Sequence, residues 1–273
     1  MGEDNRAIGV FDSGIGGLTA MRELSALLPH EDIVYFGDTG RVPYGTRSRE
    51  TIVKYARQDA RFLCSFDLKL LLIACGTASY AALETLQKEL PIPVFGVVEG
   101  ASRRAVEVTR VGRVAVLATP ATISGHVFGN FLKGLSQEIT VIEKACPLFV
   151  PVVENGRFRP EDPLVRILTE EYLAPVREAG ADTIILGCTH YPLLSEAISR
   201  CVPGAALISS GAEAAKAVAD SLKKNGLTAP EGRIGTRRYF VSDSVEQFKQ
   251  NAGMYLCHPL DGSVAWVDIE KYE

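Results

Sequence analysis

One short pattern occurs twice in this chain: an apolar run of strand length ends at a cysteine, and a helix-forming segment follows at once. Cys75 ends the apolar run at residues 70–74, and Cys188 ends a second run at residues 183–187. Open α/β sheets bind ligands where buried strands give way to helices. We therefore predict that the two thiols face each other across one pocket.

Strand-like and helix-like segments alternate along most of the sequence. Such alternation is typical of βαβ units, which build a parallel sheet with helices on both faces. The expected strands are residues 7–11, 33–36, 68–74, 94–98, 113–118, 139–142, 183–187 and 206–208. The expected helices are residues 18–28, 50–66, 78–90, 125–134, 162–180, 192–201 and 212–225, and residues 147–156 read as a turn around Glu154.

The order of these elements in the first hundred residues recurs in the second hundred. Residues 8–12 correspond to residues 114–118, and Cys75 corresponds to Cys188. We therefore predict an α/β fold of two similar, doubly wound parallel-sheet domains, related by a pseudo-repeat, with the active site at their interface. The first domain is predicted at residues 1–98 plus 209–273, because the segment from Arg238 should add a strand and a helix back onto it. The second is predicted at residues 99–208.

Composition limits the kind of partner and the compartment. Of the 273 residues 47% are apolar and 23% charged, as in globular proteins. The net charge of −4 and the lack of a Lys/Arg-rich block argue against nucleic acid as a partner. The apolar runs are too short for a membrane span, and the polar start lacks a signal-peptide pattern, so we expect no membrane partner and a cytoplasmic location. No CxxC pair supports a zinc site, and free thiols are favoured over disulfides.

The two strand-end cysteines are the main candidates for chemistry. A single cysteine in such a place is more often a small buried packing residue. Two at equivalent points of a duplicated plan indicate a functional pair. A helix N-terminus favours the reactive thiolate, and we expect Thr77 or Ser79 to cap the helix after Cys75 and Pro192 to begin the one after Cys188. The remaining cysteines are interpreted as core residues: Cys64, Cys146, Cys201 and Cys257.

Three further groups lie near turns or strand ends. The loop at residues 12–17 lacks the third glycine of a dinucleotide fingerprint, so its amides suit a carboxylate ligand, unless the loop is only a turn before a helix. Asp12 ends the first strand and is expected to point into the ligand crevice. His190 can assist the Cys188 thiol or protonate a departing group, and Glu154 can polarise a neighbouring group. A structural role is the alternative for each.

Two opposed thiols suit the racemisation of a carbon centre. One thiolate removes a proton while the opposite thiol delivers one, which requires both within reach of the carbon. Donors must also hold the carboxylate on which charge accumulates. Hydroxyls and amides of this kind belong to Thr77, Thr119, Thr122, Thr189, Ser13 and Gly14. No lysine is placed to anchor pyridoxal phosphate, so we expect no cofactor, and we expect no metal.

The chain resembles the glutamate racemases of the aspartate/glutamate racemase superfamily. The resemblance covers about residues 7–250. It is carried by IGVFDSGIGGL at residues 8–18, YFGDT at 35–39, VPYG at 42–45, AC and TAS within 74–79, PVFGVVE at 93–99, ACPLFVP at 145–151 and LGCTHYP at 186–192. It implies two α/β domains with the active site between them and cofactor-independent interconversion of L- and D-glutamate for peptidoglycan. It also implies a homodimer and glutamate as the small-molecule substrate.

The resemblance assigns roles to single positions. Cys75 and Cys188 match the catalytic thiols, and Asp12, His190 and Glu154 match groups that assist proton transfer. The substrate-binding positions matched are Ser13, Pro43, Tyr44, Gly45, Thr77 and Thr189.

Gly76 is the main departure from the family pattern, which usually has asparagine after the first cysteine. Because that side chain helps to hold the substrate, we expect a Gly76→Asn variant to bind glutamate more tightly. A smaller departure is Ala118, where a glycine commonly precedes the threonine.

Several alternatives remain at this point. An aspartate racemase is the nearest, and a decarboxylase of this fold would need only one thiol. A hydrolase using Cys188, His190 and Asp12 would leave Cys75 without a task. A non-catalytic amino-acid-binding protein is the last.

Overall fold

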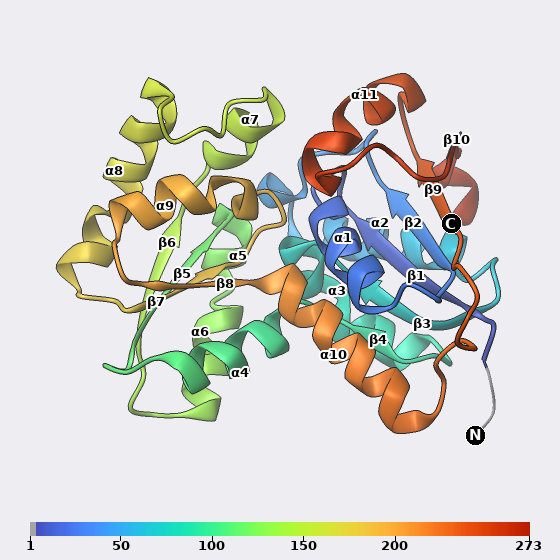
Figure 1. Cartoon of the computed structure of the whole chain (residues 1–273), viewed down its shortest axis with the longest axis horizontal. Coiled ribbons are helices and arrows are strands. Elements are labelled where there is room, and N and C mark those ends of the chain that lie inside the picture. Colours follow the sequence, from blue (N-terminus) through green and yellow to red (C-terminus); the bar gives the residue numbers. More distant parts are fainter. Residues whose placement is uncertain (1–3) are drawn as a thin grey trace.

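Two parallel sheets, each with helices on both faces, lie side by side in the computed structural model, which describes residues 4–273 (Figure 1). Over this range the first sheet has the order β10 (Ser263–Trp266), β9 (Arg237–Val241), β2 (Ile33–Gly37), β1 (Ala7–Asp12), β3 (Leu68–Ile73), β4 (Val94–Phe95). The second has the order β6 (Thr140–Ala145), β5 (Arg113–Ala118), β7 (Thr183–Leu186), β8 (Ala206–Ser209). All neighbouring strands run parallel. The predicted fold class is confirmed.

The two sheets repeat one strand order. Strands β2–β1–β3–β4 of the first sheet correspond to β6–β5–β7–β8 of the second. Cys75 follows β3 and Cys188 follows β7, so the two cysteines occupy equivalent places. The carboxyl ends of parallel strands meet at one edge of a sheet, which is where such sheets place ligands. Each half therefore has a thiol at the equivalent place on its ligand-binding edge.

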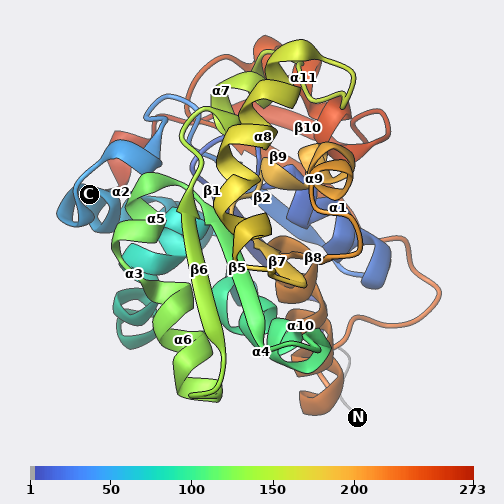
Figure 2. The same ribbon diagram turned by 90° about the vertical axis from the view of Figure 1, so that its left-hand side faces the viewer.

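Alternate residues of the central strands face different helical layers, as a period of two requires. In β5, Ala115 and Leu117 contribute to one core cluster, whereas Val114 and Val116 contribute to another. Helices α4 (Val98–Val108) and α6 (Val127–Leu135) cover one face of the second sheet, and α8 (Pro163–Glu178) and α9 (Ser195–Cys201) cover the other (Figure 2). The first sheet is covered by α1 (Leu18–Leu27), α10 (Ser210–Asn225) and α11 (Val245–Leu256) on one face, and by α2 (Arg49–Leu63) and α3 (Gly76–Glu89) on the other.

The C-terminal segment returns to the first sheet, as expected from residues 238–241. Strand β9 pairs with β2, and β10 pairs with β9. The exact limits of the two domains, at residues 98 and 209, stay predictions. Helix α4 contacts both α10 and α6, so no clean gap separates the halves there.

Several element predictions were wrong in detail. Strand β4 ends at Phe95, and helix α4 already begins at Val98. Residues 147–156 were expected to form a turn, but they contain α7 (Phe149–Glu154). The helix expected at 125–134 is present as α6, but the short helix α5 (Pro120–Ser124) before it was not expected. The helix expected at 192–201 is the 3-10 turn η2 (Tyr191–Leu194) followed by α9. Proline and glycine do not exclude these short helices, since proline is tolerated in the first helical turn.

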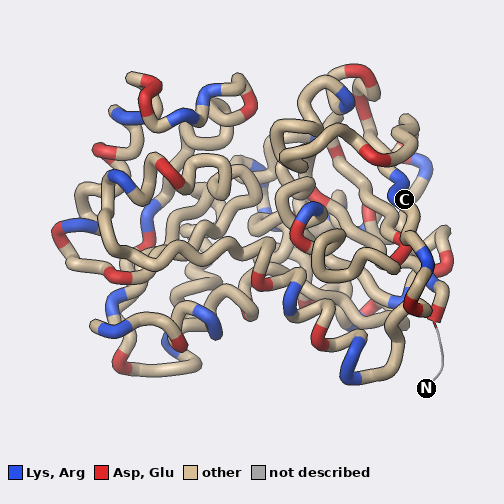
Figure 3. Tube along the Cα trace, in the orientation of Figure 1, with Lys and Arg blue, Asp and Glu red and all other residues tan. Residues whose placement is uncertain are grey.

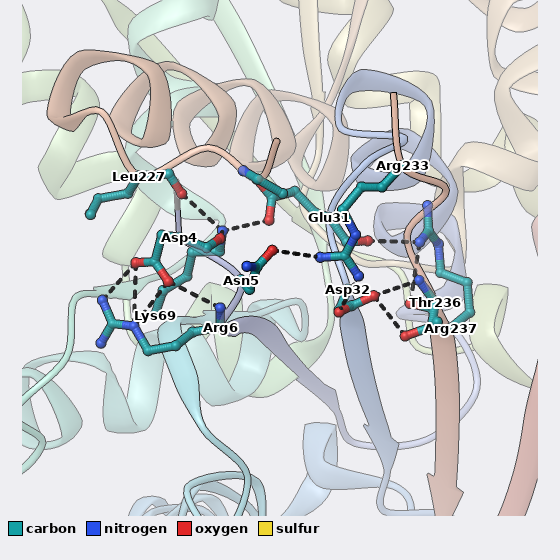
Figure 4. A network of polar contacts seen from close by, with 11 residues as sticks. Asp4, Asn5, Arg6, Glu31, Asp32, Lys69, Leu227, Arg233, Thr236 and Arg237 are labelled. Atoms are coloured by element: carbon teal, nitrogen blue, oxygen red, sulfur yellow. Dashed lines mark hydrogen bonds and ion pairs between the residues drawn. The ribbon is translucent and has the colours of Figure 1, made fainter. Parts of the chain in front are cut away.

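A buried ion pair stabilises the first half at the start of β3 (Figure 4). The ammonium of Lys69 lies 2.6 Å from Glu31 Oε2 and donates to the carbonyls of Asp4 and Leu227 at 2.8 Å each. Glu31 also accepts from the Ala229 amide at 2.7 Å. Full pairing is what a buried charge requires. The network fastens the segment that leads from α10 towards β9, at the amino ends of the strands.

Charged residues of both signs are interspersed over both halves (Figure 3). Within residues 4–273 no helix combines the length and the apolar character needed to cross a membrane.

Candidate active site

Cys75 itself caps the helix that follows β3. Its sulfur accepts a hydrogen bond from the Ala78 amide at 3.4 Å, so the cysteine is the N-cap of α3. The predicted caps were wrong. Ser79 donates to the Ile73 carbonyl at 3.1 Å, and the Thr77 hydroxyl turns towards the second half. The reactive sulfur is therefore held directly at the positive end of a fourteen-residue helix.

The surroundings of Cys75 favour the protonated thiol. The sulfur is buried and donates to the Ser13 hydroxyl at 3.4 Å. Burial and, to a smaller degree, the negative charge of Asp12 raise the pKa of Cys75 to about 12, and the hydrogen bonds with Ser13 and Ala78 oppose this rise. Without a ligand, this thiol holds its proton.

Cys188 has different neighbours. It is buried after β7, but no helix begins on it: His190 precedes the short turn η2, and Pro192 is inside that turn. The Cys188 sulfur lies 3.8 Å from Nδ1 of His190, whose Nε2 lies 3.0 Å from Oε1 of Glu154. The predicted grouping of Cys188, His190 and Glu154 is thus present in space, and it forms a sulfur–imidazole–carboxylate row.

The imidazole in this row is positively charged at neutral pH. Burial lowers the pKa of His190, but hydrogen bonds to Cys188 and Glu154 outweigh that effect and raise the pKa to about 10. The charged ring donates one N–H towards the sulfur and the other to the carboxylate. Tyr255 packs edge-on against the ring, with centroids 5.6 Å apart.

Asp12 ends β1 beneath the loop at residues 13–17. Its Oδ2 accepts from the Gly14 amide at 3.0 Å, while Oδ1 is buried and has no hydrogen-bond partner within the described residues. Burial raises the pKa of Asp12, and the charge of His190 opposes this rise. The carboxylate is buried and is not among the groups that line the cavity.

A cavity of about 320 Å³ lies between the two halves and brings most of the predicted residues together. The predicted residues that line it are Ser13, Pro43, Gly45, Cys75, Gly76, Thr77, Thr119, Glu154, Cys188, Thr189 and His190. Asp12, Tyr44 and Thr122 do not line it. The ring of Tyr44 is buried in the first half, while its neighbours Pro43 and Gly45 line the cavity, so a substrate-binding role for position 44 stays a prediction.

Three threonine hydroxyls join the halves beside the cavity. Thr77 lies 3.0 Å from Thr119 and 3.3 Å from Thr122, and the last two lie 3.1 Å apart. Thr77 belongs to α3, whereas Thr119 and Thr122 follow β5. Hydroxyls can both donate and accept, so the cluster can adjust to a carboxylate or an ammonium group.

Gly76 touches the opposite half through its backbone. A Cβ atom at this position would lie 2.3 Å from the carbonyl oxygen of Gly187, which is far closer than side-chain atoms come to backbone. The residues next to the two thiols are thus in direct contact. An asparagine at position 76 would therefore require the two halves to move apart, and its expected effect on glutamate binding stays a prediction.

The sequence interpretation missed a third thiol at the cavity. Cys146, assigned to the core, follows β6 and lines the wall together with Pro147 and Asn155. Its position after a strand of the same sheet was the available signal. Burial raises the pKa of Cys146 well above that of an ordinary thiol, so it stays protonated. Among the described residues no cluster of three or more His, Cys, Asp or Glu side chains is arranged to hold a metal ion.

Two parallel α/β halves that place Cys75 and Cys188 at equivalent strand ends of one cavity define a class of enzyme that exchanges protons on two faces of a carbon, as a racemase does. A sequence model described as Asp/Glu/Hydantoin racemase matches residues 12–218. The chain belongs to this racemase family, and it is therefore an isomerase acting on an amino acid.

Known relatives agree along nearly the whole chain. It is 45% identical over 266 residues to the glutamate racemase of Geobacter metallireducens, with 97% of each chain covered. Its structure is similar to that of a glutamate racemase isoform from Bacillus anthracis, with 38% identity, a TM-score of 0.92 and 97% and 98% of the two chains covered. It is also similar to the glutamate racemase of Francisella tularensis in complex with D-glutamate, with 36% identity, a TM-score of 0.91 and coverage of 98% and 100%.

Aspartate racemases are more distant. The one from Picrophilus torridus shares 16% of the sequence, with a TM-score of 0.59 over 83% of this chain and 96% of its own. That likeness shows a common fold.

Proposed function

We propose that this chain is a glutamate racemase in which Cys75 and Cys188 exchange a proton with the two faces of Cα. The observation that carries this proposal is that Cys75 and Cys188, at equivalent strand ends of the two halves, line a single cavity. Its glutamate racemase relatives, 40% identical or more over most of the chain, support glutamate as the substrate. The D-glutamate formed supplies peptidoglycan synthesis.

The reaction needs two proton transfers and no change of oxidation state. One cysteine thiolate takes the proton of Cα and becomes a thiol, and the electron pair stays on the carbon and its carboxylate. The opposite thiol then delivers its proton to the other face and becomes a thiolate. After one turnover the two cysteines have exchanged protonation states, so the reverse reaction begins from the product state.

The resting enzyme is prepared unequally for these steps. Burial keeps Cys75 as a thiol, with a pKa raised to about 12. At the other side, the charged imidazole of His190 lies 3.8 Å from the Cys188 sulfur. For the enantiomer whose Cα proton faces Cys188, Cys188 acts as base and Cys75 as acid, and the other enantiomer reverses these roles.

Hydroxyl and amide groups hold the substrate while charge accumulates on its carboxylate. The threonine cluster of Thr77, Thr119 and Thr122 lies beside the cavity, and Ser13 is hydrogen-bonded to Cys75. Such fixed donors are worth most where water is excluded. Asp12 and Glu154 balance the charge of His190 during the transfers. These roles complete a mechanism that uses only groups of this chain.

The direct test follows solvent deuterium at Cα. The enzyme is incubated in D₂O with L-glutamate, D-glutamate or L-aspartate, and the Cα proton signal is followed by NMR. Exchange is expected with both glutamate enantiomers and at least about tenfold more slowly with aspartate, because the shorter side chain misplaces its second carboxylate. Absence of exchange with every substrate contradicts the proposal, and faster exchange with aspartate identifies the rival specificity.

We further propose a cytoplasmic location and a homodimer. All six cysteines are unpaired, and the chemistry requires free thiols, which a reducing compartment maintains. Light scattering on the purified protein tests the dimer: a mass of one chain across a hundredfold range of concentration excludes it.

A further inference from the structure

A buried polar network lies behind the loop at residues 42–46, whose residues Val42, Pro43, Gly45 and Thr46 line the cavity. Tyr44 points away from the cavity and is 1% exposed. Its hydroxyl is hydrogen-bonded to Asp38 and lies 3.0 Å from Oδ2 of Asp59. The loop is thus anchored by a tyrosine between two carboxyl groups.

Arg41 binds the same two carboxyl groups from the other side. Its Nε donates to Asp38 at 2.7 Å and its Nη2 to Asp59 at 2.8 Å. The guanidinium also donates to Gln58 at 2.5 Å and lies 4.1 Å above the ring of Tyr55. Every nitrogen of the guanidinium therefore has an acceptor, which fixes the first residue before the loop.

The number of protons shared by the Tyr44 hydroxyl and the two carboxyl groups determines whether both carboxyl groups can be charged. Tyr44 has one hydroxyl proton but lies against oxygens of two carboxyl groups, so it can donate to only one of them. The short contact is with Asp38, which also accepts from Ser242 at 2.8 Å and pairs with Arg41. The second contact requires a proton on Asp59, which then donates to the tyrosine oxygen.

The charges agree with this count. Both carboxyl side chains are fully buried, and one guanidinium faces them. A second buried negative charge without its own cation is costly. Burial, the charge of Asp38 and the more distant charge of Asp12 raise the pKa of Asp59 well above the usual range, and Arg41 opposes them only in part.

We propose that Asp59 is held as a neutral acid that donates to Tyr44, and that this chain of hydrogen bonds positions the 42–46 loop for substrate binding. Asp59, Tyr44, Asp38 and Arg41 are then positioning residues, since all four lie outside the cavity wall. The inference rests on the proposed function only in that glutamate is taken as the ligand that the loop contacts.

The loop reaches both halves, which explains how a distant proton affects binding. A Cβ atom at Gly45 would lie 3.0 Å from Cβ of Thr119, so the loop lies directly against the threonine cluster. A displacement of the loop would alter the substrate-binding wall and leave the thiols on β3 and β7 in place. Loss of the network should therefore raise KM more than it lowers kcat.

The kinetic experiment compares a substitution that keeps the hydrogen bonds of a neutral Asp59 with substitutions that remove hydrogen bonds or the charge of Asp38. Asp59→Asn keeps the shape of the neutral acid, because its amide donates to Tyr44 and its oxygen accepts from Arg41, so KM should stay within about twofold of the parent. Asp59→Ala, Tyr44→Phe and Asp38→Asn should raise KM about tenfold or more, with kcat within about threefold. Tyr80→Phe, a tyrosine outside the network and the cavity, is the matched control.

Two outcomes overturn the inference. One is an Asp59→Asn variant as impaired as Asp59→Ala at equal thermal stability. The other is an Asp38→Asn variant as mild as Asp59→Asn. The protonation itself is read independently of activity from the ¹³C carboxyl shifts of aspartate-labelled protein at pH 7, with Asp59→Asn providing the assignment. A signal at the ionised position refutes the neutral acid even if the enzyme racemises glutamate. A neutral acid in an enzyme that exchanges no glutamate refutes only the proposed function.

Discussion

The two thiols occupy equivalent strand ends but have unequal neighbours. Cys75 caps a helix, contacts the hydroxyl of Ser13 and keeps its proton because burial raises its pKa to about 12. Cys188 has no helix of its own and lies beside the charged imidazole of His190. The repeated strand order thus gives the two thiols similar positions, whereas the side chains around them differ. A two-thiol mechanism needs one thiol and one thiolate at the start of each turnover.

Removal of either thiol should have the largest effect, and the two effects should be equal. Cys75→Ser and Cys188→Ser are each expected to lower kcat by about 10³-fold or more in both directions, since a hydroxyl gives up its proton far less readily than a thiol. The rates are measured by circular dichroism from L- and from D-glutamate.

Cys64→Ser is the control for this comparison, because Cys64 is an exposed thiol at the end of α2. It should behave as the parent. A Cys75→Ala variant that retained activity would show that one thiol suffices and would restore the hydrolase interpretation.

Removal of the side chain beside each thiol should reveal that the two thiols depend unequally on their neighbours. His190→Gln removes a charged partner of Cys188 and is expected to lower kcat by about 10²-fold, whereas Ser13→Ala removes one neutral hydrogen bond to Cys75 and should cost about two- to tenfold. Steady-state kinetics in both directions give the two ratios. Equal losses would show that the thiols are held alike and that the comparison is wrong.

The sequence predicted most of the site because its signals were local. A cysteine directly after an apolar run must lie at a strand end, so Cys75 and Cys188 were placed correctly by strand order alone. The direction of a side chain inside a turn is not local information. Tyr44 was assigned to the substrate wall, but its partners Asp38 and Asp59 come from two other elements, and only their joint packing turns the ring inward.

Contacts between the halves were equally out of reach. Gly76 was interpreted by what its missing side chain fails to offer the substrate. Its role depends on Gly187, more than a hundred positions away, whose carbonyl fills the space of a Cβ atom. The third thiol, Cys146, was missed because its expected strand ended at residue 142, whereas β6 continues to Ala145 and delivers the cysteine to the cavity.

The contact next to the thiols gives a smaller, geometric test. Gly76→Ala forces the carbonyl of Gly187 away and should destabilise the fold by about 1–3 kcal/mol, as overpacking does. Because the shift separates the two thiols, kcat should also fall by roughly tenfold. Kinetics and chemical denaturation measure the two effects.

Gly134→Ala is the matched control, since a Cβ atom there meets no other atom within 4 Å. It should leave activity unchanged. A Gly76→Asn variant that binds glutamate more tightly would show that the halves separate without cost, and the contact would then have no part in spacing the thiols.

The smallest expected effect is on the pH dependence of stability, and it isolates the charged side of the comparison. The pKa of His190 is raised from 6.5 to about 10 in the folded protein, so protonation favours folding. This contribution is fully present below pH 6.5 and is lost as the pH rises towards 10. His190→Asn should therefore flatten the fall in Tm over this window, with each kcal/mol worth about 2–4 °C. His258→Asn, at an exposed histidine, should leave the parent slope unchanged. If His190→Asn kept the parent slope as well, the positive charge would not be stabilised by Cys188 and Glu154, and both thiols would begin the reaction in equivalent surroundings.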